Sequence, residues 1–378
     1  SSSNSFTTNP RSNKNWPKRS APVTVGSNSI AVIDPPALDQ LPTSTNAMHA
    51  LAIANMIRFV TAPMPRNAAT VVSAASPNIV FIMTDQHSAD ALSCRMGDRY
   101  LKTPALDSLA ARGTFFSRAY TPNPLCMPAR NSIFTGRYPH ETGITDNTKT
   151  TLDASAFVTM GTHFRQAGYQ TAYFGKWHLA YDEAATKTHG FGTLETGHID
   201  AENAALATKF LARKHDQPFL LVVSFLNPHN VCELARDQQL NNGPIGKPPS
   251  VEKLPPAPAN LAPPRNEPDT MAQIRAGYHA NPQFPVGNFN PQMWQALRWG
   301  YYRLIEKVDA EIGKVLAALK AAGLEENTLI VFTADHGECA GAHGFNQKTV
   351  FNEESARVPF IVSAPGQRAG RVSEKFTN

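Results

Sequence analysis

The sequence has 378 residues, of which 42% are hydrophobic, and it carries a formal net charge of +5 at pH 7. This length suffices for one large α/β domain or two modest ones, and no run approaches the roughly 20 consecutive apolar residues that span a bilayer. Residues 1–76 contain six basic and two acidic side chains, a difference of +4, so the rest of the chain is nearly neutral and does not have the basic excess that nucleic-acid binding requires.

Residues 1–76 differ in composition from the rest of the chain. They are dominated by Ser, Asn, Thr, Pro and Ala and contain no long periodic segment, which predicts a poorly ordered N-terminal tail or leader. Residues 48–75 partly resemble an export signal, although Arg58 and Arg66 interrupt the apolar stretch. The match is poor, so the compartment stays open, with a secreted or periplasmic location slightly favoured over a cytoplasmic one. The four cysteines do not decide the compartment, because none lies in a C-x-x-C pair.

Alternating strand and helix patterns begin at Pro77. Asn78–Asp85 is a continuous apolar run that ends in an acid, which predicts a buried parallel strand. Thr103 and Pro104 then favour the start of a helix that Gly113 ends. Similar patterns predict strands at Gln170–Lys176, Phe219–Phe225, Thr328–Thr333 and Val358–Ser363, and helices at Phe157–Ala167, Ala201–Lys214 and Gln292–Ala322. This alternation indicates an α/β fold with a mainly parallel sheet covered by helices on both faces.

Residues 244–268 interrupt the alternation of strands and helices. They contain nine prolines, and proline removes the backbone donor on which regular elements depend. A Pro-rich surface insertion is therefore predicted here, inside a domain that extends over residues 77–378.

Ionisable or metal-binding side chains follow four of the five predicted strands. Catalytic and ligand sites of open α/β sheets lie beyond the carboxyl ends of the strands. Lys176 and His178 are two residues apart, so on a strand they would face the same side. We expect one site to be built from these four strand ends: Asp85-Gln86, Lys176-Trp177-His178, Asn227-Pro228-His229 and Asp335-His336.

The segment around Cys126 has the features of an anion site with a nucleophile. Pro128 suits the first turn of a helix, so Cys126 would lie at a helix N-terminus, where free N–H groups favour an anion. Arg130 lies four residues further on, about one helical turn, and can point back to the same place. A nucleophile beside a helix N-terminus and a guanidinium is suited to attack on an oxyanion ester.

The spacing Cys126-x-Pro128-x-Arg130, followed by Ser132 and Gly136-Arg137, resembles the signature of the formylglycine-dependent (type I) sulfatases, members of the alkaline-phosphatase-like superfamily. The resemblance extends over residues 77–378 and includes the strand ends named above. It implies an alkaline-phosphatase-like sandwich, in which a large, mostly parallel mixed sheet lies between helical layers. Because the family usually continues beyond the strand at Val358–Ser363, it also implies that a C-terminal subdomain is missing and that the catalytic domain is truncated at that end.

The resemblance also implies a modified nucleophile and a bound metal ion. A maturation enzyme would convert Cys126 to formylglycine, whose hydrate supplies the attacking hydroxyl. One divalent cation would be held by Asp85, Gln86, Cys126, Asp335 and His336. Carboxylate and amide oxygens suit calcium or magnesium, whereas an imidazole shifts the preference toward manganese. Calcium is the expected ion, with manganese or magnesium as alternatives.

For the substrate, the resemblance implies roles for side chains around the nucleophile. Arg130 and Lys176 would support the hydrate and the sulfate oxygens, and His178 would help to break down the sulfated intermediate. His229 and Lys348 would contact the sulfate or protonate the leaving alkoxide. The residues implied in binding the substrate are Asn147, Lys176, His229 and Lys348.

The expected function is hydrolysis of a sulfate monoester, and the expected partners are a sulfated small molecule or carbohydrate and a maturation enzyme. Many sulfatases have Asp where Gln86 stands and Asn where His336 stands. The Gln86 and His336 combination also resembles choline-sulfatase-like enzymes and phosphonate monoester hydrolases. A phosphonate monoester or phosphodiester hydrolase is therefore one alternative, and a truncated inactive remnant is another. The sequence does not predict the oligomeric state.

Overall fold

The structure is a computed structural model that describes residues 76–149 and 151–378. The predicted N-terminal tail or leader, residues 1–76, lies outside the described residues apart from Ser76. Within the described ranges, no helix combines the length and the apolar composition that crossing a membrane requires.

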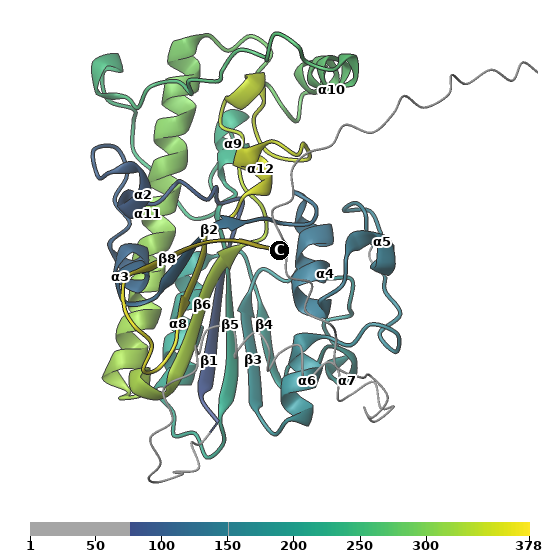
Figure 1. The fold of residues 1–378 in the computed structure, drawn as a ribbon, viewed down its shortest axis with the longest axis vertical. Helices are drawn as coiled ribbons and strands as arrows, with labels where there is room; N and C mark the ends of the chain where they lie inside the picture. The colour runs from purple at the N-terminus through teal and green to yellow at the C-terminus, as the bar shows by residue number, and fades with distance from the viewer. Residues whose placement is uncertain (1–75, 150) are drawn as a thin grey trace, which may run out of the picture. The chain divides into compact units, whose positions relative to one another are not determined.

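The described residues contain one eight-stranded sheet, with the strand order β4-β3-β5-β1-β6-β7-β2-β8 (Figure 1). In that order, the strands are Thr193–Thr196, Gln170–Gly175, Phe219–Pro228, Asn78–Asp85, Thr328–Ala334, Phe360–Ser363, Thr114–Ala119 and Arg371–Thr377. The first five run parallel to one another, whereas β7 is antiparallel to both β6 and β2. The predicted α/β fold with a mostly parallel mixed sheet is thus confirmed.

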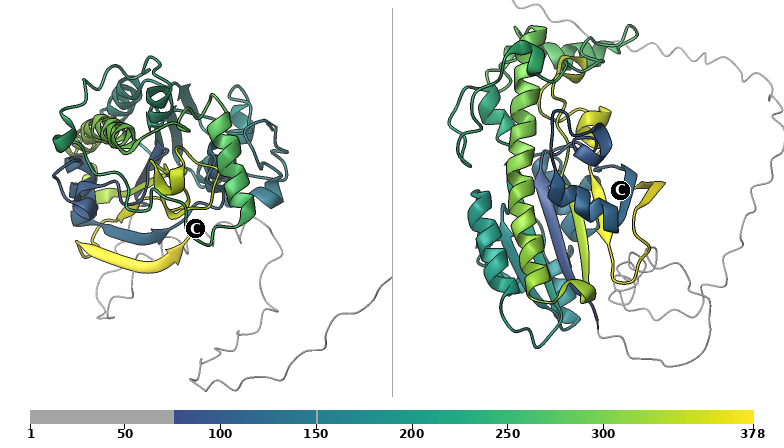
Figure 2. Two further views of the ribbon diagram at one scale, coloured as in Figure 1. Left: turned by 90° about the horizontal axis from the view of Figure 1, so that it is seen from above. Right: turned by 90° about the vertical axis from the view of Figure 1, so that its left-hand side faces the viewer.

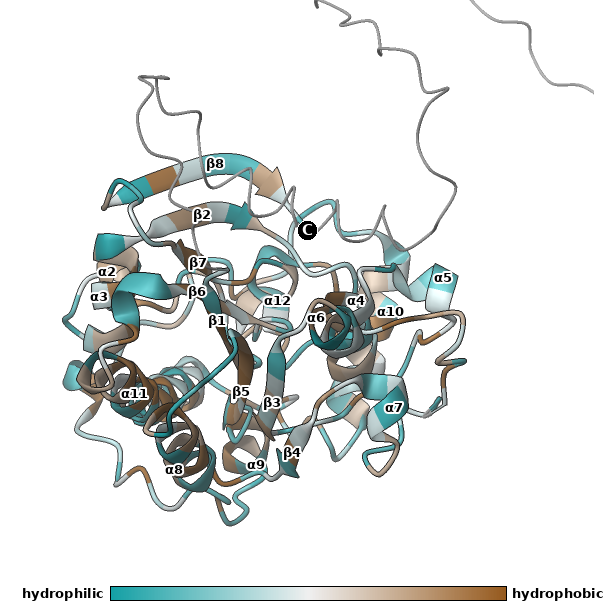
Figure 3. Cartoon of the chain, turned by 90° about the horizontal axis from the view of Figure 1, so that it is seen from below, coloured by the Kyte–Doolittle hydropathy of each residue, from teal (hydrophilic) through white to brown (hydrophobic). Residues whose placement is uncertain are grey.

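One face of the sheet is covered by α3 (Pro104–Arg112), α8 (Asp200–Leu211) and α11 (Pro291–Ala321). Successive side chains of a strand point to opposite faces, and Val80 and Ile82 of β1 both point to this one. There they join apolar side chains of the three helices in a single buried cluster. Viewed along the strands, α8 and α11 lie together on this side of the sheet (Figure 3).

The opposite face of the sheet packs against α4 (Cys126–Thr135) and α6 (Met160–Gln166). Phe81 and Met83, the alternate residues of β1, form a second buried cluster with Phe134 of α4. Figure 3 shows α4 and α6 on the side of the strands that lies away from α11. Burial of both faces explains why the central strands are continuous apolar runs rather than alternating ones.

The helix α11 is longer than the sheet requires. Its C-terminal half belongs to the cluster on the sheet, whereas Trp294, Leu297 and Tyr301 of its N-terminal half belong to a third buried cluster that includes Val231 of α9 (Val231–Ala235). Figure 2 shows α11 running along the sheet and past the carboxyl ends of the strands. This helix therefore connects the core of the sheet with the region where the strand ends meet.

The remaining elements lie in the connections. They are α2 (Ser93–Met96), α5 (Pro139–Thr142), α7 (Thr186–His189), α10 (Asp269–Ala280) and α12 (Glu353–Ala356), and the 3-10 helices Val251–Lys253, Glu325–Asn327 and Ala342–Gly344. Between residues 244 and 268, Val251–Lys253 is the single such element. The helix predicted from Phe157 begins later, at Met160, because the side chain of Thr159 accepts the Thr162 N–H and caps it there.

Candidate active site

The predicted strand ends come together because their strands are neighbours. β3, β5, β1 and β6 are adjacent in the sheet, and all four are parallel, so their carboxyl ends share one edge. Asp85 is the last residue of β1, and Asp335 follows β6 directly. Lys176 follows β3, where Gly175 has a φ of 112°, and a Cβ at that glycine would collide with the Ser224 carbonyl oxygen. Glycine therefore permits the turn that aims Lys176 into the site.

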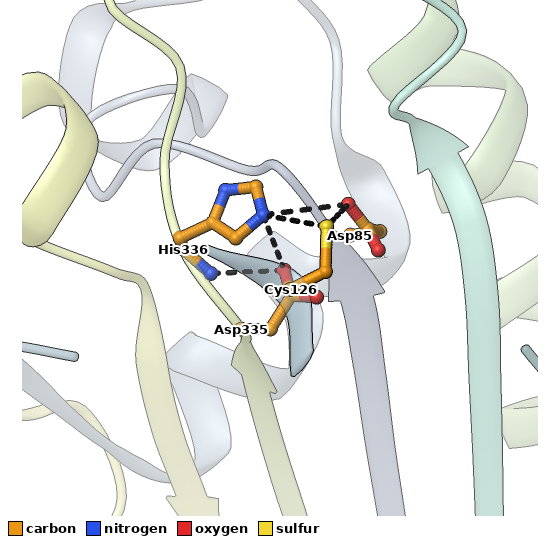
Figure 4. Close-up of side chains that lie close together, drawn as sticks. All are labelled: Asp85, Cys126, Asp335 and His336. Atoms are coloured by element: carbon orange, nitrogen blue, oxygen red, sulfur yellow. Dashed lines mark hydrogen bonds and ion pairs between the residues drawn. The ribbon is translucent and has the colours of Figure 1, made fainter. Parts of the chain in front are cut away.

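Cys126 is the first residue of α4, as predicted, and its side chain is buried among the strand ends. Its Sγ lies 3.2 Å from His336 Nε2 and 3.8 Å from Asp85 Oδ1. Figure 4 shows the four side chains of Asp85, Cys126, Asp335 and His336 pointing toward one another. One ligand atom from each lies within 4.8 Å of the others.

The donor set of this cluster fits a metal cation. Two carboxylates, an imidazole and a sulfur converge, and the Nδ1 of His336 donates to the Gly337 carbonyl oxygen at 3.0 Å, which turns the Nε2 toward the cluster. Burial opposes a charge on His336, but the negative charges of Asp335 and Cys126 raise its pKa above the ordinary value. The cluster thus favours positive charge at the place where a cation would lie.

Arg130 holds the two carboxylates in position. Its Nε donates to Asp335 Oδ2 at 2.8 Å and its Nη2 to Asp85 Oδ2 at 3.1 Å. Its Nη1 donates to the Lys176 carbonyl oxygen and to Ser224 Oγ. All three nitrogens of this fully buried guanidinium are engaged within the protein, so Arg130 acts on the site mainly by fixing the carboxylates.

Two lysines set the charge around the sulfur. Lys176 Nζ lies 3.9 Å from Cys126 Sγ and also contacts Asp85 Oδ2. Burial raises the pKa of Asp85, but Lys176 and the other nearby cations outweigh it and hold that pKa well below its usual range. Burial and Asp85 raise the pKa of Cys126, yet the charges of Lys176 and Lys348 lower it overall. The site therefore stabilises negative charge at residue 126.

Lys348 and His229 complete the charged surroundings. Lys348 is buried and donates to the amide oxygen of Gln86. Burial opposes its charge, but Cys126, Cys232 and Asp85 raise the pKa of Lys348, so it stays protonated. Burial, followed by the charges of Lys348 and Lys176, lowers the pKa of His229 to about 4. His229 is therefore a neutral imidazole beside two ammonium groups at neutral pH.

Gln86 and His178 lie at the site in unusual backbone conformations. Both have positive φ, 69° for Gln86 and 48° for His178, which is uncommon for residues with a Cβ. Because β3 ends at Gly175, the strand spacing argument for Lys176 and His178 does not apply. Among the described residues, the Nδ1 of His178 has no hydrogen-bond partner, and the side-chain amide of Gln86 bonds Lys348 through its oxygen and Glu338 through its nitrogen.

Asn147 contacts the helix that carries Cys126. Its Oδ1 accepts the Met127 N–H at 3.0 Å, so it satisfies one of the free donors at the N-terminus of α4. The side chain is otherwise exposed, which leaves its NH₂ group free for the predicted substrate contact.

Replacing Asn147 with alanine is expected to lower the free energy of unfolding by about 1 kcal/mol, because the Met127 N–H loses its acceptor. Urea denaturation would measure this loss. Asn147→Asp keeps the acceptor and should retain the stability. If the NH₂ group also binds the substrate, this second variant will raise KM, and an unchanged KM would rule out the substrate contact.

Three residues of the site were not predicted from the sequence. Ser224 of β5 accepts from Arg130 at 2.9 Å. Asp200 accepts the Leu226 and Asn227 N–H groups at 2.7 and 3.1 Å and so fixes the end of β5. Glu338 is buried and binds Gln86. Ser224 is a lone polar residue in an apolar run, which is a usable signal, whereas the pairings of Asp200 and Glu338 depend on distant segments.

Comparison with known proteins identifies the family. The Sulfatase family model matches residues 77–378. The chain is 33% identical over 323 residues to an ulvan-active sulfatase from Formosa agariphila, and this similarity covers 77% of the chain and 56% of that protein. Across five of its curated relatives, the chain spans between 56% and 65% of their length.

Two solved structures show the same fold. A protein in complex with its substrate D-glucosamine-2-N,6-O-disulfate has a TM-score of 0.63 and 25% identity, over 80% of this chain and 74% of the other. The phosphonate monoester hydrolase of Agrobacterium radiobacter has a TM-score of 0.62 and 25% identity, over 79% of this chain and 71% of the other. The buried cysteine, carboxylates and cations at one edge of this α/β sheet, together with the family match, establish that the chain belongs to the sulfatase family.

Proposed function

We propose that this chain provides the catalytic centre for hydrolysis of a sulfate monoester. The observation that carries the proposal is the placement of Cys126 at the N-terminus of α4 and within hydrogen-bonding reach of Asp85, His336 and Lys176. Lys176, Lys348 and His336 place positive charge around residue 126, which suits an anionic ester. The match to an ulvan-active sulfatase and the solved complex with a sulfated glucosamine favour a carbohydrate as the substrate, with another sulfated small molecule as the alternative.

The residues that would hold a divalent cation are Asp85, Gln86, Cys126 in its modified form, Asp335 and His336. A bound cation lowers the pKa of a coordinated hydroxyl and screens the charge of the sulfate oxygens. We propose calcium, because carboxylate and amide oxygens make up most of the set, with manganese or magnesium as alternatives. Gln86 would contribute its amide oxygen, which also accepts from Lys348.

Cys126 is the residue that we propose a maturation enzyme oxidises to formylglycine, whose hydrate supplies the attacking hydroxyl. Lys176 and Arg130 orient the group at position 126, the first directly and the second through Asp85 and Asp335. His178, whose Nδ1 is free of protein partners among the described residues, is the proposed proton acceptor for release of sulfate.

The leaving alkoxide needs a proton or a compensating charge. We propose that Lys348 contacts the sulfate oxygens and compensates the charge of the leaving alkoxide, because its ammonium stays charged in these surroundings; protonation of that alkoxide by Lys348 is the alternative role. His229, a neutral imidazole beside Lys348, would form a hydrogen bond with the leaving group, either as donor or as acceptor. Asn147, at the start of α4, would contact the substrate through its NH₂ group.

The proposed reaction can be tested with aryl esters. The protein, produced with a formylglycine-forming maturation enzyme and loaded with calcium, is expected to hydrolyse an aryl sulfate faster than an aryl phosphodiester. Removal of the cation with a chelator is expected to abolish this turnover, and added calcium to restore it. Turnover of neither ester by fully modified, metal-loaded protein would contradict the proposal and favour an inactive remnant.

A second candidate function is hydrolysis of phosphonate monoesters or phosphodiesters with the same groups. It is favoured by Gln86 and His336 and by the similarity to the phosphonate monoester hydrolase of Agrobacterium radiobacter. The segment Gly175-Lys-Trp-His178 favours the sulfatase instead. Faster turnover of the aryl phosphodiester in the same assay would select this alternative.

For the location of the protein, we propose that it is secreted or periplasmic.

A further inference from the structure

Glu338 joins the two segments that carry Gln86 and Lys348. Its side chain is 1% exposed. One carboxylate oxygen accepts the Ala340 and Gln347 N–H groups at 2.9 and 2.6 Å, and the other accepts Gln86 Nε2 at 2.5 Å. None of the roles proposed above for binding or catalysis uses this buried carboxylate, although every one of its partners lies next to the site or in it.

The carboxylate decides which way the amide of Gln86 is turned. Both oxygens of Glu338 accept N–H groups, one from the backbone of Ala340 and Gln347 and the other from Gln86, so Gln86 presents its NH₂ group to Glu338. Its Oε1 therefore points the other way, where Lys348 Nζ donates to it. If the amide were reversed, its NH₂ group would face the ammonium of Lys348 and its oxygen would face the carboxylate, and both contacts would be unfavourable.

The same carboxylate also fixes the backbone beside Lys348. Gln347 precedes this lysine and has a φ of 64°, a conformation that its N–H bond to Glu338 helps to hold. On the other side, the Ser88 hydroxyl donates to the Glu338 carbonyl oxygen and accepts the Glu338 N–H, both at 2.9 Å. Glu338 is thus bound to the segment after β1 and to the loop of Lys348 at once.

We propose that Glu338 is a positioning residue, which orients the amide of Gln86 so that its oxygen accepts from Lys348 and would be available as a ligand to a bound cation. The proposal rests on the proposed function, because it assigns Glu338 to the same site. It also accounts for the amide at position 86, because a carboxylate there would face the Glu338 carboxylate across a 2.5 Å contact.

The variant Glu338→Gln separates orientation from packing, because the two side chains have nearly the same shape. The oxygen of the new amide would keep the two backbone N–H groups, so its NH₂ group would face Gln86 and force that amide to turn over. Calcium affinity, measured by titration calorimetry, and kcat are each expected to fall by about 10- to 100-fold, the range for partners that orient metal ligands.

The reciprocal exchange tests the orientation directly. In Gln86→Glu alone, two carboxylates would face each other. In Gln86→Glu combined with Glu338→Gln, the new NH₂ group at 338 again has an acceptor, and the second oxygen at 86 accepts from Lys348. The double variant is therefore expected to bind calcium more tightly and to turn over faster than either single variant. Additive effects would instead make the double variant worse than both.

Asp309→Asn serves as the matched control. Asp309 of α11 is also a buried carboxylate. It accepts two backbone N–H groups at the start of α3, from Ala105 at 3.0 Å and from Leu106 at 2.9 Å. This variant is expected to lower the melting temperature without changing calcium affinity or kcat. A loss of calcium affinity as large as that of Glu338→Gln would show that any buried carboxylate has this effect and would overturn the assignment.

The assignment is also overturned if Glu338→Gln binds calcium like the unaltered protein, or if the double variant is no better than the single ones. Because calcium affinity is measured without a substrate, the two proposals can fail separately. Suppose that calcium binding is lost in Glu338→Gln and recovered in the double variant, but that the unaltered protein hydrolyses no sulfate ester. This result would support the role of Glu338 and refute the proposed function. If Glu338→Gln does not fold, comparison of Gln86→Glu with the double variant gives the same decision.

Discussion

Replacing Cys126 with serine is expected to abolish hydrolysis of sulfate esters, with a loss in kcat on the order of 10⁶-fold, as for other catalytic nucleophiles. Serine is close to cysteine in size, so the packing around the buried side chain should persist. A serine side chain offers one hydroxyl, whereas an aldehyde hydrate offers two, and the second can expel sulfate and restore the aldehyde. The measurement is turnover of an aryl sulfate, together with the melting temperature.

Cys94→Ser is the control for this substitution, because Cys94 is exposed and lies outside the site. It should leave turnover and melting temperature unchanged. Peptide mass spectrometry of the unaltered protein should find formylglycine at position 126 in active preparations. Full activity in material that contains only cysteine there would contradict the proposed mechanism.

Replacing Arg130 with leucine is expected to lower the free energy of unfolding by about 3–5 kcal/mol, because one partner of a buried ion pair is removed and the other is left uncompensated. Here the loss leaves Asp85 and Asp335 without the guanidinium that bonds both of them. Urea denaturation in the presence of a chelator would measure the effect. Added calcium should restore part of the stability, since it would bind the folded carboxylates and not the unfolded chain.

The control is Arg112→Leu, which removes a partly exposed ion pair with Glu325. Surface pairs contribute about 0–1 kcal/mol, so this variant should unfold close to the unaltered protein. If Arg130→Leu behaved in the same way, Arg130 would not be what holds the carboxylates together.

The central sheet was predictable because it is buried on both faces. Strands such as Asn78–Asp85 are continuous apolar runs, and their burial pattern is uniform in the structure. The two edge strands β4 and β8, and β2 next to β8, were not predicted. β8 has exposed residues along its length, so no apolar pattern in its sequence distinguishes it from a loop. Its pairing with β2 depends on backbone hydrogen bonds between distant segments, which composition does not reveal.

The residues that form the site were predictable where a reactive side chain follows a strand or belongs to the Cys126 motif. The structure brings Asp85, Cys126, Asp335 and His336 within reach of one another. The detailed partners were not predictable. The bond from Arg130 to Asp335 joins residues 205 positions apart, and that from Gln86 to Glu338 joins residues 252 positions apart. Such pairings follow from the three-dimensional fold and leave no local pattern in the sequence.

The length of α11 has a consequence for local unfolding near the site. The Tyr301 hydroxyl donates to the Gln86 carbonyl oxygen at 2.9 Å, while Ile312 and Val315 of the same helix are fully buried against the sheet. A helix anchored at both places resists fraying in either one alone. Amide protons around Gln86 should therefore exchange with deuterated solvent nearly as slowly as those of the innermost strands, which is unusual for a loop that lines a reactive centre.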